Sequence, residues 1–212
     1  MRYGMVIDLN RCTGCHGCAM ACKAQHGIPT GVWWSKVLET EEGTYPNCHV
    51  LYTPVLCMHC ENAPCVEVCP TGATFKREDG IVMQNEEACI GCQLCVNACG
   101  YGARTFVEKI EPVDPDHGFN PYEEMMYQQH YESVVQKCNF CADQLDEGED
   151  PACVRTCVAY ARYFGDLDDP ESDVSKLLAE HKQDAFQPEP GNGSPASDYK
   201  PSVYYLPKVN LI

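Results

Sequence analysis

Residues 12–22 read CTGCHGCAMAC and residues 89–99 read CIGCQLCVNAC, so one cysteine spacing, C-x2-C-x2-C-x3-C, occurs twice in the chain. Two related patterns complete a set of four. Residues 57–69 place four residues between the second and third cysteines, and residues 138–157 place eleven there. This internal repeat gathers 16 of the 17 cysteines, and it predicts a fold built around cysteine sites. In chain order the motifs contain Cys12, Cys15, Cys18 and Cys22 (motif one); Cys57, Cys60, Cys65 and Cys69 (motif two); Cys89, Cys92, Cys95 and Cys99 (motif three); and Cys138, Cys141, Cys153 and Cys157 (motif four).

The composition gives these cysteines a structural task. The chain has 212 residues and a formal net charge of -16, and Leu, Ile, Val and Phe together supply 41 residues, or 19%. So few large apolar side chains with so much charge are typical of disordered proteins. Bonds made by the cysteines must therefore replace part of an ordinary core, and disulfides, zinc, haem and iron–sulfur clusters are the candidates.

Several classes of protein are disfavoured. No stretch approaches the roughly 18–20 consecutive apolar residues of a membrane-spanning helix. The first residues, MRYGMVIDLNRC, do not have the pattern of a signal peptide, which disfavours a secreted disulfide scaffold. The strong negative charge disfavours nucleic-acid binding, because that function needs a basic face.

The spacing favours iron–sulfur clusters over haem and zinc. Cys12 to His16 matches the C-x-x-C-H pattern of haem attachment, but Cys18 and Cys22 continue the series and motif three has Gln93 in place of His16. Four-cysteine zinc sites use paired C-x-x-C units and do not explain the third and fourth cysteines of each motif. In a bacterial [4Fe–4S] pair, three cysteines on one tight loop hold one cluster and the fourth reaches the other cluster.

Small residues stand where such loops must turn. Gly14, Gly17 and Gly91 lie between ligands and leave the backbone free to aim N–H groups at the sulfurs. Four complete motifs predict four [4Fe–4S] clusters, and an apo chain that is largely unfolded because metal binding supplies folding free energy. Cys48 lies outside the motifs, and we expect a buried or idle thiol there.

The stretches between the motifs predict short elements. Residues 2–9 favour a strand, residues 73–84 a hairpin, and residues 172–181 an amphipathic helix. Residues 108–137 predict an acidic inserted loop or lobe, within a stretch, 108–150, of net charge -10. Trp33 and Trp34 are adjacent, so one of them is free to anchor a partner. From Gln187 onward the chain reads as a tail laid across a neighbouring surface.

In these motifs the chain resembles the four-cluster iron–sulfur subunit of the DMSO reductase family of molybdenum or tungsten enzymes. That family includes the electron-transfer subunits of polysulfide, thiosulfate, DMSO and respiratory arsenate reductases. The likeness rests on MVIDLNRCTGC, GTYP, CMHCENAPCVEVCPTGA, REDGIV, CIGCQLC and FGDLDDPES, and it extends over nearly all of the chain except 108–137. One departure concerns the residue after each fourth cysteine. A proline is common there, and only Cys69 has it; Lys23, Gly100 and Val158 follow the others.

The resemblance implies an α+β fold of two ferredoxin-like modules, each binding two [4Fe–4S] clusters, with loop-rich connections. We expect an outer module from residues 1–50 with 138–212, an inner module from 51–107, and the acidic insertion at 108–137. The implied function is electron transfer, with no catalysis by the chain itself. The implied partners are a large molybdopterin or tungstopterin catalytic subunit and an integral membrane, quinone-binding subunit. The implied location is the extracytoplasmic face of the membrane, reached by co-export with the catalytic subunit, or otherwise the cytoplasm. A free-standing polyferredoxin and a zinc-binding interaction module remain alternatives.

Crossover ligation, in which each fourth cysteine joins the cluster of the partner motif, predicts the ligand sets. The resemblance supports this pairing and places the cluster of motif one nearest the catalytic subunit and that of motif three at the far end. The expected sets are Cys12, Cys15, Cys18 and Cys157 (cluster 1); Cys138, Cys141, Cys153 and Cys22 (cluster 2); Cys57, Cys60, Cys65 and Cys99 (cluster 3); and Cys89, Cys92, Cys95 and Cys69 (cluster 4).

Overall fold

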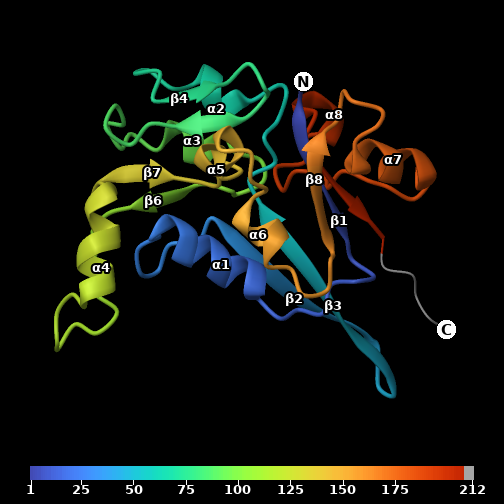
Figure 1. Cartoon of the computed structure of the whole chain (residues 1–212), viewed down its shortest axis with the longest axis horizontal. Helices are drawn as coiled ribbons and strands as arrows, with labels where there is room; N and C mark the ends of the chain where they lie inside the picture. The colour runs from blue at the N-terminus through green and yellow to red at the C-terminus, as the bar shows by residue number, and fades with distance from the viewer. Residues whose placement is uncertain (208–212) are drawn as a thin grey trace.

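The structure, a computed structural model, describes residues 1–207 and shows short helices and four small sheets of mixed α/β character (Figure 1). In this part of the chain, no helix has both the length and the apolar character needed to cross a membrane. The elements in chain order are β1 (Tyr3–Asp8), α1 (Gly17–His26), β2 (Ser35–Thr44), β3 (Asn47–Leu56), α2 (Pro64–Glu67), β4 (Thr74–Lys76), β5 (Val82–Gln84), α3 (Leu94–Asn97), β6 (Thr105–Val107), α4 (Pro121–Met126), the 3-10 helix η1 (Tyr127–Gln129), β7 (Val134–Gln136), α5 (Ala142–Asp146), α6 (Ala152–Arg155), β8 (Arg162–Asp166), α7 (Asp173–Glu180), α8 (Ala196–Tyr199) and β9 (Val203–Leu206).

The two ends of the described chain meet in one sheet of order β8-β1-β9. The predicted N-terminal strand is confirmed as β1, which runs antiparallel to β8 and parallel to β9. The expectation of a tail on a neighbouring surface is wrong for β9, because Val203 and Tyr205 are almost fully buried beside β1. Strand β1 has two edges that need a hydrogen-bonding partner, and β9 occupies one of them. Residues 208–212 of the expected tail lie outside the described residues.

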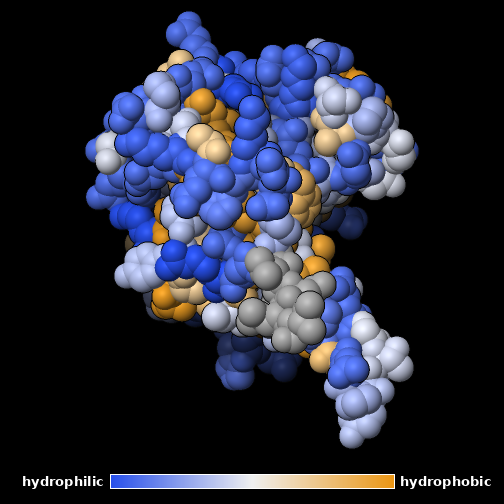
Figure 2. All heavy atoms as spheres, turned by 90° about the vertical axis from the view of Figure 1, so that its right-hand side faces the viewer, coloured by the Kyte–Doolittle hydropathy of each residue, from blue (hydrophilic) through white to orange (hydrophobic). Residues whose placement is uncertain are grey.

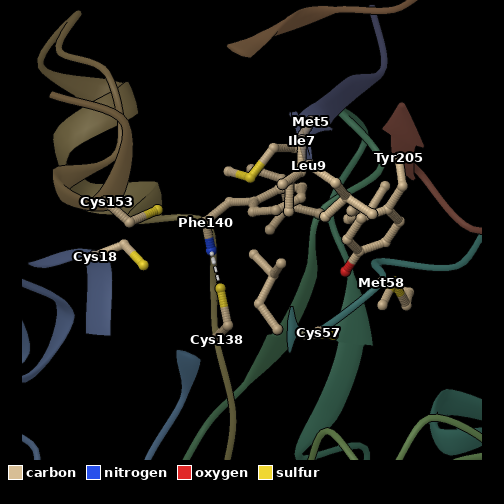
Figure 3. Close-up of a cluster of buried hydrophobic side chains, with 13 residues drawn as sticks. Met5, Ile7, Leu9, Cys18, Cys57, Met58, Cys138, Phe140, Cys153 and Tyr205 are labelled. Carbon is tan, nitrogen blue, oxygen red and sulfur yellow. Dashed lines mark hydrogen bonds between the residues drawn. The ribbon is translucent and has the colours of Figure 1, made fainter. Parts of the chain in front are cut away.

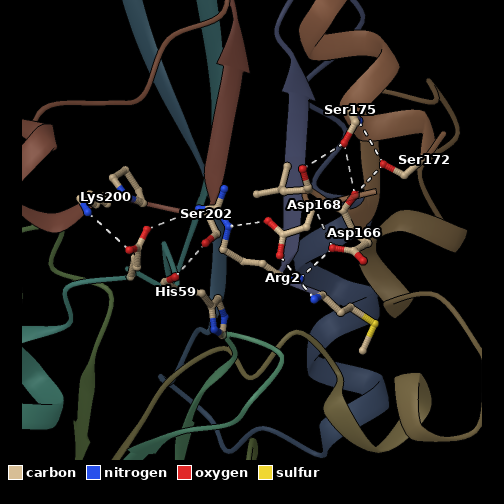
Figure 4. A network of polar contacts seen from close by, with 12 residues as sticks. Arg2, His59, Asp166, Asp168, Ser172, Ser175, Lys200 and Ser202 are labelled. Carbon is tan, nitrogen blue, oxygen red and sulfur yellow. Dashed lines mark hydrogen bonds and ion pairs between the residues drawn. The ribbon is translucent and has the colours of Figure 1, made fainter. Parts of the chain in front are cut away.

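Polar contacts fasten this sheet to the segment that carries motif two (Figure 4). The Arg2 backbone N–H donates to Asp166 at 2.7 Å, and the Arg2 side chain lies 3.6 Å from an Asp168 carboxylate oxygen. Ser202 donates from its hydroxyl to the backbone carbonyl of His59 at 3.1 Å. Arg2 Nη1 also lies 3.9 Å from a Glu61 carboxylate oxygen, so both ends of the described chain are held against residues 57–61.

Three two-stranded hairpins make up the other sheets. The hairpin predicted over residues 73–84 is confirmed as β4 and β5, and β6 pairs with β7. The longest, β2 with β3, projects from the body of the molecule, where Figure 2 shows a mostly hydrophilic surface. Cys48 lies near the tip of this projection and is exposed, so of the two expected alternatives the buried thiol is wrong.

The acidic insertion is a folded lobe rather than a loop. Asn120 begins α4 with a capping box, and the buried Glu123 carboxylate accepts the backbone N–H groups of Asn120 and Val113. The lobe contacts the end of α1, because the Tyr122 hydroxyl donates to the Ala24 carbonyl at 3.1 Å.

The helix predicted over 172–181 is confirmed as α7, capped by the Ser172 side chain.

Cysteines form part of the main buried core, as the composition predicts. Met5, Ile7 and Tyr205 of the sheet pack with Phe140 in one cluster of buried side chains. Cys18, Cys57, Cys138 and Cys153 belong to the same cluster (Figure 3). The core and the cysteine motifs are therefore one structure.

Candidate iron–sulfur sites

The loops between the cysteines turn through left-handed residues. Gly14 and Gly91 have φ of 69° and 66°, and a Cβ at these positions would lie 2.3 Å from the Tyr52 ring and 2.2 Å from the Ser133 carbonyl oxygen. Both glycines are therefore required, as predicted. Gly17 is not used in this way, since it begins α1 and the left-handed residue before it is His16, at φ 58°.

The helices carry the later cysteines of each motif. In motif one, both Cys18 and Cys22 lie in α1, whose N-terminal end begins directly after the loop. In the other three motifs the third cysteine lies within a helix of four residues and the fourth follows it: α2, α3 and α6. Helix α1 packs against α6, and α2 packs against α3. Motif one is thus brought to motif four, and motif two to motif three.

The first neighbourhood joins the ends of the chain. A cavity is lined by Cys12, Cys15 and Cys18 of motif one together with Cys157 of motif four. One turn further along α1, burial and the neighbouring thiols of Cys138, Cys153 and Cys141 raise the pKa of Cys22.

The second neighbourhood joins motifs two and three. Burial, followed by the thiols of Cys57, Cys65 and Cys99, raises the pKa of Cys60. Burial and the nearby Cys65 and Cys89 thiols also raise the pKa of Cys95. Cys69 differs, because N–H and hydroxyl donors from Thr71 and Thr74 outweigh desolvation and lower its pKa. The Thr74 N–H to Cys69 Sγ distance is 3.3 Å.

The thiols fit an iron–sulfur cluster in their chemistry. Burial raises the pKa of Cys141 to about 11, so that thiol is neutral near pH 7 unless a cationic centre holds it as a thiolate. Backbone donors are already aimed at the sulfurs. Phe140 N–H lies 3.4 Å from Cys138 Sγ, and Ala161 N–H lies 3.2 Å from Cys157 Sγ. Such N–H groups stabilise cluster-bound thiolates and adjust their potentials.

A site for a single metal ion such as zinc needs its ligands gathered around one point. Among residues 1–207, no group of three or more His, Cys, Asp or Glu side chains is arranged to hold one ion. Zinc would draw four sulfurs to about 2.3 Å from one point, whereas a cubane holds each thiolate on its own iron atom.

Three buried cationic side chains lie beside the cysteines, and the sequence did not predict them. Arg104, Lys137 and Arg162 are each exposed by 5% or less. Lys137 donates from Nζ to the carbonyl oxygens of Cys138 (2.6 Å) and Val82. A signal for the two arginines is present in CGYGAR (99–104) and CVAYAR (157–162), where an Ala-Arg pair ends five residues after a fourth cysteine.

Gly100, the departure noted after motif three, has a steric reason. A Cβ there would lie 2.7 Å from Pro190 Cβ and 3.1 Å from the Tyr199 hydroxyl. Gly191 N–H also donates to the Gly100 carbonyl at 2.8 Å. The glycine therefore lets the C-terminal segment lie against motif three, and α3 itself ends normally at Asn97.

Exposure differs among the sixteen motif cysteines. Cys15 of motif one and Cys92 of motif three are exposed, whereas the others are buried or half-buried. Cys22 and the three thiols around it, those of Cys138, Cys141 and Cys153, are all buried. The two exposed motif cysteines thus belong to different neighbourhoods, and the thiols around Cys22 form the buried group.

Comparison with known proteins agrees with this architecture. Two segments, residues 48–115 and 108–167, match the family described as 4Fe-4S dicluster domain. The chain is 40% identical to the arsenate respiratory reductase iron-sulfur subunit of Shewanella sp. (strain ANA-3), over 97% of this chain and 96% of that protein. It is 38% identical to a tetrathionate reductase subunit of Salmonella typhimurium, over 97% of this chain and 72% of the relative. It is 36% identical to one polypeptide of the polysulfide reductase of Wolinella succinogenes, over 97% of this chain and 94% of the relative.

The fold and its cysteine sites define a ferredoxin-like protein with two 4Fe-4S dicluster domains. The chain therefore belongs to the family of iron–sulfur subunits of reductase complexes in the molybdopterin enzyme family, which confirms the resemblance seen in its motifs. It is an electron-transfer component and not a catalytic subunit. The dicluster matches and the four cysteine motifs support four [4Fe–4S] clusters.

Proposed function

We propose that this chain relays electrons between a molybdopterin or tungstopterin catalytic subunit and a second redox partner, such as a quinone-linked membrane anchor. The observation that carries the proposal is the exposure of Cys15 and Cys92, in motifs that do not share a neighbourhood. A relay needs two surfaces at which electrons enter and leave, with the remaining sites protected between them. Location on the extracytoplasmic face, after co-export with the catalytic subunit, remains part of this proposal, and fractionation of the native complex tests it.

The proposal includes two modules with two clusters each, formed by residues 1–50 with 138–212 and by 51–107, with 108–137 as the insertion. The thiol neighbours described above support crossover ligation, because Cys22 lies among motif-four thiols and Cys99 beside Cys60. The proposed ligands are Cys12, Cys15, Cys18 and Cys157 (cluster 1); Cys138, Cys141, Cys153 and Cys22 (cluster 2); Cys57, Cys60, Cys65 and Cys99 (cluster 3); and Cys89, Cys92, Cys95 and Cys69 (cluster 4).

When bound, each [4Fe–4S] cluster accepts and releases one electron at a time. The chain holds these groups on loops whose backbone N–H groups face the sulfurs, and it shields the interior ones from water. The four thiols of the proposed cluster 2 site are all buried, which suits an interior step of the relay.

Apolar side chains surround both exposed ends. Val158 and Tyr160, which follow Cys157, are exposed by 75% and 71%. Ile90 and Leu94, which flank Cys92, are exposed by 66% and 47%. Exposed apolar side chains next to a redox site are suited to a partner surface that excludes water around the point of transfer.

Two measurements test this function. The purified native complex should contain, per chain, about 16 iron and about 16 sulfide, four of each per cluster. Co-purification should bring a molybdopterin or tungstopterin subunit with the chain. A folded chain isolated without partners would favour the polyferredoxin, and a colourless zinc protein would favour the interaction module.

Introduction of a negative charge at each apolar end separates the two surfaces. Val158→Asp and Ile90→Asp should each slow electron transfer to one partner by about tenfold or more, the effect of losing about 1.4 kcal/mol of interface energy. Tyr45→Asp at the hairpin tip, where the side chain is 88% exposed, is the control and should change neither rate. Equal effects of both variants on one partner would contradict a relay with two ends.

Spectroscopy of serine variants tests the ligand sets. Cys22→Ser and Cys138→Ser should perturb one EPR signal, and Cys12→Ser a different one. If Cys22→Ser instead matched Cys12→Ser, each motif would hold its own cluster and the crossover would be wrong.

A further inference from the structure

Two arginines lie inside the protein, and no carboxylate of residues 1–207 forms an ion pair with them. The side chains of Arg104 and Arg162 are exposed by only 5% and 4%. Burial of an unpaired cation costs several kcal/mol. The polar partners of both guanidinium groups within residues 1–207 are neutral oxygens and sulfurs. A fold that retains two such charges must supply negative charge from another source.

Arg162 lies between motif one and motif four. Its Nη2 lies 3.3 Å from Cys18 Sγ and 3.3 Å from the hydroxyl oxygen of Ser35. Cys153 and Cys138 are further nearby thiols, and in Figure 3 Cys18 and Cys153 lie next to one another. Under the proposed ligation, Cys18 belongs to cluster 1 and Cys153 to cluster 2.

Arg104 occupies the equivalent place between motif two and motif three. Its Nη1 donates to Thr74 Oγ1 at 3.2 Å and to Gln84 Oε1 at 2.9 Å, which fixes the guanidinium plane. The thiols of Cys65, Cys57 and Cys95 are its neighbours. The Nη2 atom is buried and has no hydrogen-bond partner among the described residues. Apart from the neighbouring thiols, this N–H group faces no acceptor in residues 1–207.

The two arginines are related by the internal repeat. Each is the fifth residue after the last cysteine of its motif pair, Cys99 or Cys157, and each follows an alanine. Each also has two third cysteines among its neighbouring thiols, Cys65 with Cys95 and Cys18 with Cys153. The same charge therefore recurs at the same place in two halves of the fold that differ in chain connectivity.

We propose that Arg162 and Arg104 are positioning residues for electron transfer, each placing one fixed positive charge between two clusters and raising the reduction potentials of both. This inference rests on the proposed ligand sets. Four thiolates around an iron–sulfur core make a negative site, and reduction adds one more negative charge to it. A cation between two such sites stabilises the reduced form of each, and it weakens their mutual repulsion when an electron leaves one and enters the other. Arginine stays protonated throughout, so no proton moves with the electron.

The experiment is a potentiometric titration of the native complex, followed by EPR, with neutral and charge-retaining variants. Arg162→Gln should lower the potentials of two clusters, 1 and 2, each by at least a tenfold change in the reduction equilibrium, or 59 mV for one electron. Arg104→Gln should do the same for clusters 3 and 4. Lys176→Gln removes one exposed positive charge on α7 and should shift no cluster by as much.

The charge-retaining variants keep the proposal falsifiable if a glutamine variant loses iron. Arg162→Lys and Arg104→Lys should keep four clusters, with less than a threefold change in each reduction equilibrium. A tenfold change in a lysine variant, unchanged potentials in a glutamine variant with four clusters, or equal shifts of all four clusters would overturn the proposal. Those results leave the relay itself standing, whereas a wild-type chain without four cluster signals would remove the proposed function.

Discussion

The hydroxyl group of Tyr205 donates to the backbone carbonyl of Pro54 at 2.7 Å, and it joins the last described strand to the strand that leads into motif two. Tyr205 is 1% exposed. Tyr205→Phe leaves a buried carbonyl unpaired and should cost about 1–3 kcal/mol of stability. Tyr205→Ala also opens a cavity and should cost about 3–5 kcal/mol. The temperature at which visible cluster absorption is lost measures both. Tyr45→Phe, at the exposed hairpin tip, should leave it unchanged.

Gly100 should tolerate no side chain. Gly100→Ala pushes a Cβ to 2.7 Å from Pro190 and should destabilise the protein by about 1–3 kcal/mol, the usual cost of overpacking. Val158 stands at the same place after motif four and is 75% exposed, so Val158→Ala should change stability by no more than about 0.5 kcal/mol. Thermal loss of the clusters compares the two. Equal stability of the two variants would contradict the close approach of the C-terminal segment.

The insertion should carry a pH-dependent contact. Burial alone would lower the pKa of His130, but hydrogen bonds to Glu86 and to the His26 carbonyl raise it. Its stabilising contribution is therefore fully present below the unfolded pKa of about 6.5 and is lost as pH rises through the higher folded pKa. Glu86→Gln should cost about 1–3 kcal/mol at pH 6 and less at pH 9, measured by thermal loss of the clusters.

The control for this pH effect is a similar pair at the surface. His117 and Asp114 lie 2.8 Å apart with their side chains 83% and 58% exposed. Asp114→Asn should change stability little at either pH, because exposed pairs contribute little. A loss in Glu86→Gln that does not vary with pH would contradict the charged state of His130.

Removal of iron should unfold much of the chain. Cys18, Cys57, Cys138 and Cys153 lie in the main core, where raised pKa values keep Cys138 and Cys153 neutral without a cationic centre. Chelation under reducing conditions should therefore remove far-ultraviolet circular dichroism together with the brown colour. Retention of the native spectrum by a chain free of iron would show that the apolar side chains alone maintain the fold.

The sequence predicted the elements that are determined by their own residues. Cysteine spacing located the four motifs, the stretch before motif one located β1, and the amphipathic pattern of residues 172–181 located α7. It did not predict β9, because only the unpaired edge of β1, nearly two hundred residues away, makes that short strand stable. It also missed Arg104 and Arg162. Their role depends on which thiols surround them, and a charged residue in a sequence gives no indication of burial.

The sheet of β8, β1 and β9 has a consequence for biosynthesis. The first strand leaves the ribosome early, yet both of its partners lie after residue 161. Motif one cannot reach its neighbours in motif four until nearly all of the chain has been translated. Residues 51–107 have no such delay, since motifs two and three pack together within one continuous stretch. Under the proposed ligand sets, we therefore expect iron and sulfide to reach motif one later than motifs two and three, after motif four has been translated.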